Sequence, residues 1–195
     1  RRSGWVAPRP RPRPAAPPFT TIPALYARCS GGDAPAWCGR YFDYVDAGGR
    51  RVLRWRWTVA DMAHHHDYWF LLAGYSEAAG VQAVFYFVDG QKNPVLSVGV
   101  NGGMDLGLLD GAVLGFGFGL LLTDGIPTKP QLLNFLTGIT AAVSLSLIIG
   151  MTAVISPTTG GEAWETTLST AAGWSIGASW GWQLGPPPCG RCAWQ

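Results

Sequence analysis

The chain has 195 residues, a net charge of +2 and 13% charged residues, about half the usual share of a globular protein. It contains 27 glycines and ten tryptophans, which is typical of a membrane protein or a glycine-rich all-β protein rather than a cytosolic enzyme. The small net charge argues against a nucleic acid partner. Motifs for phosphate binding, nucleophilic catalysis or zinc-dependent hydrolysis are missing from the sequence. We therefore expect no enzyme.

Residues 1–38 begin with a run rich in proline and arginine, RRSGWVAPRPRPRP. Proline fixes φ and removes a backbone donor, so we expect an extended segment that lies over a partner.

Residues 39–101 carry the signals of antiparallel strands. An AGG turn separates two β-prone runs in YFDYVDAGGRRVLRWRWTV, and Asp89-Gly90 begins the turn of a second hairpin. Between the hairpins, residues 60–80 predict a short helix or loop. We interpret the whole region as a small β-rich unit outside a membrane.

Three apolar runs follow, and residues 130–161 contain no charged side chain or histidine at all. A helix needs about 20 residues to cross the hydrocarbon core of a bilayer. The pattern therefore predicts a mainly α membrane protein with about three transmembrane helices in residues 102–185, followed by a cysteine-containing tail at 186–195. The expected spans are residues 104–123, 131–155 and 166–184.

Small residues recur at intervals of four in these runs, which places them on one face of a helix. Such stripes indicate close helix packing in lipid. The predicted packing residues are Gly107, Gly111, Gly115, Gly119, Gly138, Ala142, Ser146, Gly150, Gly173, Gly177 and Gly181. An all-β alternative remains open, because GFGFG and GWSIGASWGWQLG also alternate in part with a period of two.

Two groups of residues are candidates for ligand or redox chemistry. His64, His65 and His66 stand beside tyrosine and tryptophan, so we consider them for a pigment or a metal, although a polar surface loop explains them more simply. Cys189 and Cys192 have the C-x-x-C spacing of zinc or redox motifs. Eight residues separate Cys29 from Cys38, so we favour local disulfides or free thiols over a zinc site.

The sequence leads to one main functional hypothesis and two alternatives. The main one is a non-catalytic accessory subunit of a large membrane complex, photosynthetic or respiratory, in a thylakoid or mitochondrial inner membrane. Its expected partners are other membrane subunits and lipid, and bound pigment or lipid is the cofactor that we consider. The alternatives are a transporter or channel component, and an all-β binding or pore-forming protein.

Overall fold

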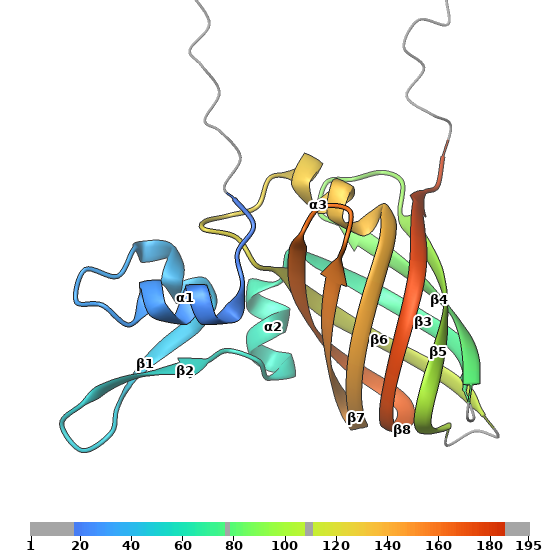
Figure 1. Ribbon diagram of the computed structural model, residues 1–195, viewed down its shortest axis with the longest axis horizontal. Coiled ribbons are helices and arrows are strands. Elements are labelled where there is room, and N and C mark those ends of the chain that lie inside the picture. The colour runs from blue at the N-terminus through green and yellow to red at the C-terminus, as the bar shows by residue number, and fades with distance from the viewer. Residues whose placement is uncertain (1–17, 77–78, 108–110, 186–195) are drawn as a thin grey trace, which may run out of the picture.

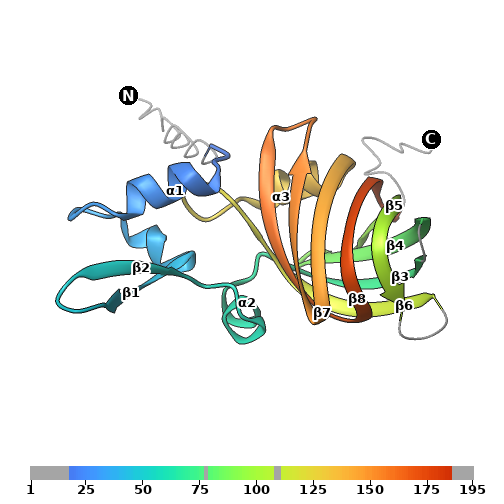
Figure 2. The same cartoon turned by 60° about the horizontal axis from the view of Figure 1, so that its bottom comes forward.

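The computed structural model describes residues 18–76, 79–107 and 111–185, which form two parts (Figure 1). A polar N-terminal unit, residues 18–67, lies beside an antiparallel β-barrel, residues 68–185 (Figure 2). The chain is therefore mainly β, whereas the sequence predicted a mainly α protein.

The N-terminal unit contains five short elements. The predicted AGG hairpin is confirmed, because its two strands pair antiparallel and Gly48 and Gly49 in the turn have φ values of 65° and 79°. Glycine adopts such positive φ values without steric cost. The elements are α1 (Ile22–Cys29), η1 (Ala36–Arg40), β1 (Phe42–Asp46), β2 (Arg51–Trp55) and α2 (Val59–His65).

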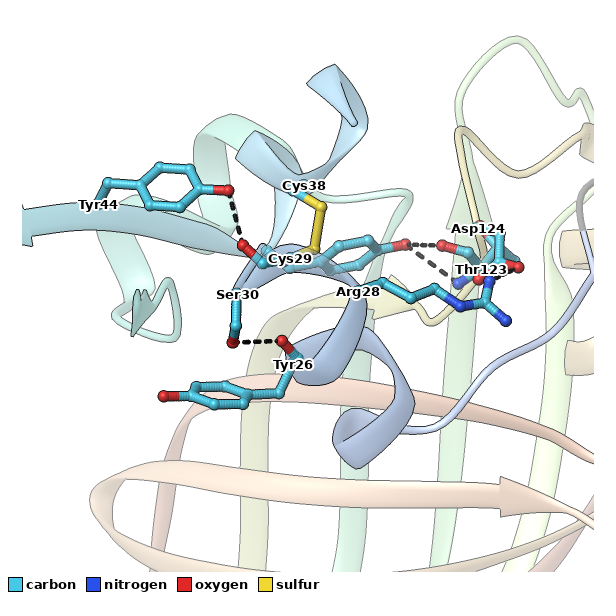
Figure 3. The surroundings of a disulfide bond; sticks show 9 residues. Tyr26, Arg28, Cys29, Ser30, Cys38, Tyr44, Thr123 and Asp124 are labelled. Atoms are coloured by element: carbon cyan, nitrogen blue, oxygen red, sulfur yellow. Dashed lines mark hydrogen bonds and ion pairs between the residues drawn. A yellow bond between two sulfur atoms is a disulfide. The ribbon is translucent and has the colours of Figure 1, made fainter. Parts of the chain in front are cut away.

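A disulfide between Cys29 and Cys38 joins the end of α1 to η1 (Figure 3), which confirms a local disulfide at this pair. The Tyr44 hydroxyl donates a hydrogen bond of 2.9 Å to the Cys29 carbonyl oxygen and ties the hairpin to the same point. Arg28 forms an ion pair with Asp124 of the barrel. The cross-link thus stabilises a unit whose own hydrophobic core is small.

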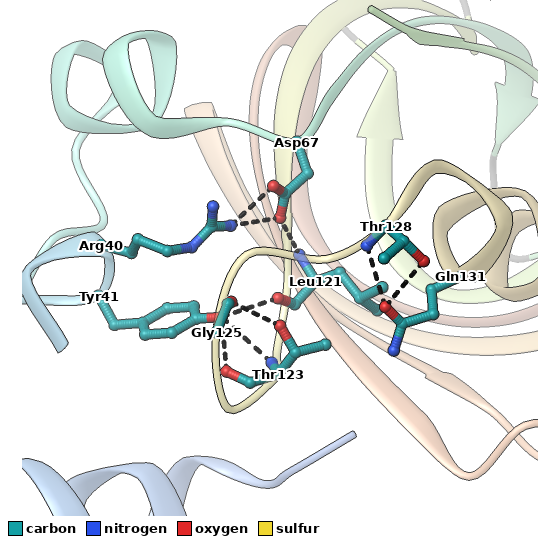
Figure 4. A network of polar contacts seen from close by, with 8 residues as sticks. All are labelled: Arg40, Tyr41, Asp67, Leu121, Thr123, Gly125, Thr128 and Gln131. Carbon is teal, nitrogen blue, oxygen red and sulfur yellow. Dashed lines mark hydrogen bonds and ion pairs between the residues drawn. The ribbon is translucent and has the colours of Figure 1, made fainter. Parts of the chain in front are cut away.

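A polar network fastens the N-terminal unit to one end of the barrel (Figure 4). The Arg40 guanidinium donates to both carboxylate oxygens of Asp67 at 2.7 Å, and the Leu121 backbone N–H donates to the same carboxylate at 2.9 Å. The Tyr41 hydroxyl lies 3.0 Å from the carbonyl oxygens of Leu121 and Thr123, and it accepts from the Thr123 N–H. All these groups lie between η1 and the end of one barrel strand.

Six strands and one helix form the barrel. Five strands close into a ring in the order β5-β4-β3-β6-β8, because β8 pairs with both β6 and β5. The sixth, β7, pairs antiparallel with β8 along nearly its whole length. The elements are β3 (Tyr68–Ser76), β4 (Ala79–Val88), β5 (Val95–Gly107), β6 (Ala112–Leu121), α3 (Lys129–Leu136), β7 (Gly138–Ser156) and β8 (Gly161–Gln183).

The two longest strands bend sharply, which lets each contribute to two parts of the wall. Residues 163–169 of β8 pair with β6, and residues 171–183 pair with β5. The bend in β7 is at Ile148, which has a φ of 73° and interrupts the register with β8. It brings the Ser144 and Thr152 hydroxyls within 3.0 Å of each other.

The three predicted membrane helices are wrong. Residues 104–123 contain the end of β5 and all of β6, residues 131–155 contain most of α3 and β7, and residues 166–184 belong to β8. The physical reason is that residues four apart share a face in a strand as well as in a helix. All the predicted packing residues lie in strands, except Gly111 in the turn before β6.

In the described residues, no helix has both the length and the apolar character needed to cross a membrane. This finding overturns the transmembrane subunit and the thylakoid or mitochondrial location that were inferred from helical spans.

The inward-facing glycines serve close packing inside the barrel. A Cβ atom on Gly119 would lie 2.1 Å from the ring of Tyr68, and one on Gly181 would lie 2.0 Å from the Leu136 carbonyl oxygen. Neither position has space for a methyl group. The small residues that suggested helix contacts therefore leave room for buried rings and for the end of α3.

The core lies at the end of the barrel that α3 covers. Leu132, Phe135 and Leu136 of α3 pack there with buried residues of the strands, among them Tyr86 and Val95. Thr128 and Gln131 cap the start of this helix (Figure 4). Away from this end the interior of the barrel becomes polar.

Candidate binding surface

Large apolar side chains cover the outer face of the barrel. They alternate with inward-facing residues at the period of two that a strand imposes. The most exposed are Leu147, at 76%, and Trp180, at 62%. All six strands contribute to the set, which consists of Leu71, Tyr75, Val81, Val98, Val100, Leu114, Phe116, Ile139, Val143, Leu145, Leu147, Ile148, Ile149, Ile155, Trp174, Ile176, Trp180 and Trp182.

We call this set the apolar wall, and strand register makes it continuous. Val143 pairs with Ile176 and Leu145 with Trp174 across β7 and β8. Trp180 lies between Ile139 of β7 and Val98 of β5. Monomeric proteins rarely expose an apolar area of this extent, and larger areas mark interaction sites.

Charged side chains are nearly missing from the apolar wall. Among the outward strand positions that the structure describes, Glu162 at the start of β8 is the one that carries a charge. The sequence has no arginine between residues 57 and 185, whereas residues 28–56 contain six. The molecule is therefore amphipathic, with a charged N-terminal unit and an apolar outer barrel surface.

Aromatic rings form a band near the barrel end where β3 begins. Trp69 and Phe87 stack on neighbouring strands with ring centroids 4.0 Å apart. Phe118 pairs with Trp69 in register on the other side. Trp182 of β8 pairs in register with Leu96 of β5, the strand next to β4. Tryptophan and tyrosine rings favour the boundary between water and hydrocarbon.

The inner face of the barrel has the opposite chemistry. It contains two adjoining cavities of about 50 and 60 Å³, lined largely by serine, threonine, glutamine and asparagine side chains. Glu165 lies in the larger cavity, and the Tyr68 hydroxyl donates to its Oε1 at 2.9 Å. Burial raises the pKa of Glu165 to about 7, although the bond from Tyr68 acts in the opposite direction. Cavities for drug-sized ligands are about 300–1,000 Å³, so only water or a small ion fits here.

The three histidines do not converge on one point. His65 contacts the Arg56 guanidinium, and burial together with that positive charge lowers its pKa. His66 turns away, with Nδ1 2.9 Å from the Ala63 carbonyl oxygen and its ring 5.0 Å from that of Phe118. The described part of the chain has no group of three or more His, Cys, Asp or Glu residues suited to a metal. Cys189 and Cys192 lie outside the described residues.

Sequence reasoning missed the residues with the most perturbed environments. Glu165 stands three residues after Glu162, at the start of the uncharged run TTLSTAAG, and nothing in the local sequence marks it as buried. Asp67 stands next to the histidine run, but its pairing with Arg40 over 27 positions gives no local signal.

Comparisons with known proteins give no assignment for this small antiparallel β-barrel. The chain matches no known protein family, no curated protein and no solved structure.

Proposed function

We propose that this chain is a non-catalytic all-β binding protein whose apolar wall binds the acyl chains of lipids. The observation that carries the proposal is the distribution of polarity, with apolar residues outside on all six barrel strands and polar residues in the part of the interior that lies away from α3. This alternation is the pattern of strands whose outer face contacts lipid. This proposal replaces the hypothesis, drawn from the sequence, that the chain is a subunit of an organellar membrane complex.

Lipid fits this surface better than a folded partner does. Exposed apolar residues occur on strands around the whole ring, from Leu71 on β3 to Val98 on β5 and Leu145 on β7. A second protein covers one face, while acyl chains can cover every side. The band of aromatic rings and the charged N-terminal unit supply the polar boundary that such a complex needs.

The experiment is flotation of the full chain with phospholipid vesicles. The wild-type protein is expected to float with the vesicles and to stay at the bottom of the gradient without them. Val143→Glu or Val100→Glu should weaken the interaction about tenfold or more, because a charge on the wall must then leave water. Both side chains are more than half exposed, so neither change should unfold the protein.

Val52→Glu is the matched control, since Val52 is 37% exposed on β2 of the N-terminal unit. It should float like the wild type. A protein that forms a discrete oligomer and ignores the vesicles would contradict the proposal, because a second copy would then cover the wall.

A further inference from the structure

Within the residues that the structure describes, the polar interior of the barrel holds one acid without a basic partner. Glu165 is 5% exposed, and its carboxylate accepts a hydrogen bond from the neutral hydroxyl of Tyr68. The other titratable group that faces it is Tyr86 on β4, and β6, β7 and α3 bring none among the described residues. Among the described residues that line the two cavities there is no lysine, arginine or histidine.

Five hydroxyl-bearing residues line the same cavity as this carboxylate, beside apolar residues such as Phe70 and Val84. Thr140, Ser144, Thr152, Thr167 and Ser179 contribute hydroxyl groups to the larger cavity. A hydroxyl can turn either its proton or its lone pairs toward a neighbour, so it adapts to whatever the cavity holds.

The neighbouring cavity contains an acceptor that lacks a donor. The Oδ1 atom of Asn101 is buried, lines this cavity and has no hydrogen-bond partner within the described part of the chain. Buried polar atoms without a partner are rare in folded proteins. The Glu165 carboxylate and Asn101 Oδ1 are therefore the acceptors in this interior that a cation or a donor-rich ion would satisfy.

We propose that the barrel interior binds one small monovalent cation, with Glu165 as the charged ligand and the hydroxyl oxygens around it as neutral ligands. Hard cations prefer carboxylate, carbonyl, hydroxyl and water oxygens. The charge favours a monovalent ion, because a single carboxylate neutralises one positive charge and a second would stay uncompensated in a buried space. A volume of about 60 Å³ holds such an ion with one or two waters.

Linkage gives this site a defined dependence on pH. A carboxyl whose pKa is raised to about 7 by burial favours the fold most at low pH. That contribution is lost as the pH rises from about 4.5 through about 7, since the ionised group is then buried without a counter-charge. A cation that pairs with the carboxylate should restore stability above neutral pH and have little effect below it.

The test compares the melting temperature of the full chain in chloride salts of sodium, potassium or ammonium with that in N-methylglucamine chloride at equal ionic strength. At about pH 8.5 at least one small cation should raise the melting temperature by about 3–6 °C. At about pH 5 the salts should give equal values, because Glu165 is then protonated.

Glu165→Gln should abolish the difference between salts, whereas Glu162→Gln on the same strand should keep it. Tyr68→Phe gives a second check if Glu165→Gln does not fold, because it keeps the carboxylate and should retain the effect. Equal melting temperatures in small and bulky cations at about pH 8.5, or an effect that survives Glu165→Gln, would overturn the proposal. Both outcomes are independent of lipid binding by the outer wall.

Discussion

Replacing Arg40 with methionine is expected to lower the free energy of unfolding by about 3–5 kcal/mol. The change leaves the Asp67 carboxylate, whose side chain is 6% exposed, without its positive partner. Burial already raises the pKa of Asp67, and the Arg40 charge works against that rise. Denaturant unfolding at neutral pH gives the measurement.

Two further variants show whether the loss of stability comes from breaking the buried ion pair or from removing any arginine. Arg54→Met removes an exposed ion pair with Asp43, which keeps Arg56 as a partner, so its stability should match that of the wild type. Combining Arg40→Met with Asp67→Asn should recover part of the loss, since no buried charge remains. Equal losses for Arg40→Met and Arg54→Met would show that the buried Arg40–Asp67 pair does not stabilise the fold.

Gly119→Ala is expected to destabilise the barrel by about 3 kcal/mol. Its new Cβ atom would lie 2.1 Å from the ring of Tyr68, which is fully buried and fixed by its bond to Glu165. Either the ring or the backbone of β6 must move. Thermal unfolding measures the loss.

Gly32→Ala is the control for this change, because its Cβ atom would meet nothing within 4 Å. The control should change the free energy of unfolding by less than about 0.5 kcal/mol. A barrel that tolerates Gly119→Ala as well as the control does would contradict the packing described for Tyr68.

Local turn chemistry made two hairpins in the first half of the fold predictable, but residues 60–80, expected as a short helix or loop, contain strand β3 as well as most of α2. The AGG turn between β1 and β2 and the Asp89-Gly90 turn between β4 and β5 both occur where the sequence indicates them. The sequence did not indicate that β4 and β5 belong to the barrel, because β5 pairs with β8, whose partner residues lie about 80 positions away.

The second half was misread because its signals suit a helix and a strand equally well. Residues four apart share a face in both, so the glycine stripes did not distinguish them. Residues 131–155 looked like one continuous element for two reasons. Helix α3 occupies their start, and β7 bends at Ile148, a residue type that gives no turn signal. The uncharged residues of this stretch form an apolar outer face and a hydroxyl-lined interior of the barrel.

The central claim is that acyl chains contact the apolar wall, and quenching of tryptophan fluorescence by brominated lipid chains tests it most directly. Trp174, Trp180 and Trp182 lie on the outer face of β8 and are 43–62% exposed. Vesicles of brominated phospholipid should quench the wild-type fluorescence strongly. A variant with phenylalanine at these three positions should lose most of that quenching, while its fold and its flotation remain. Equal tryptophan fluorescence with brominated and unbrominated vesicles would contradict the account.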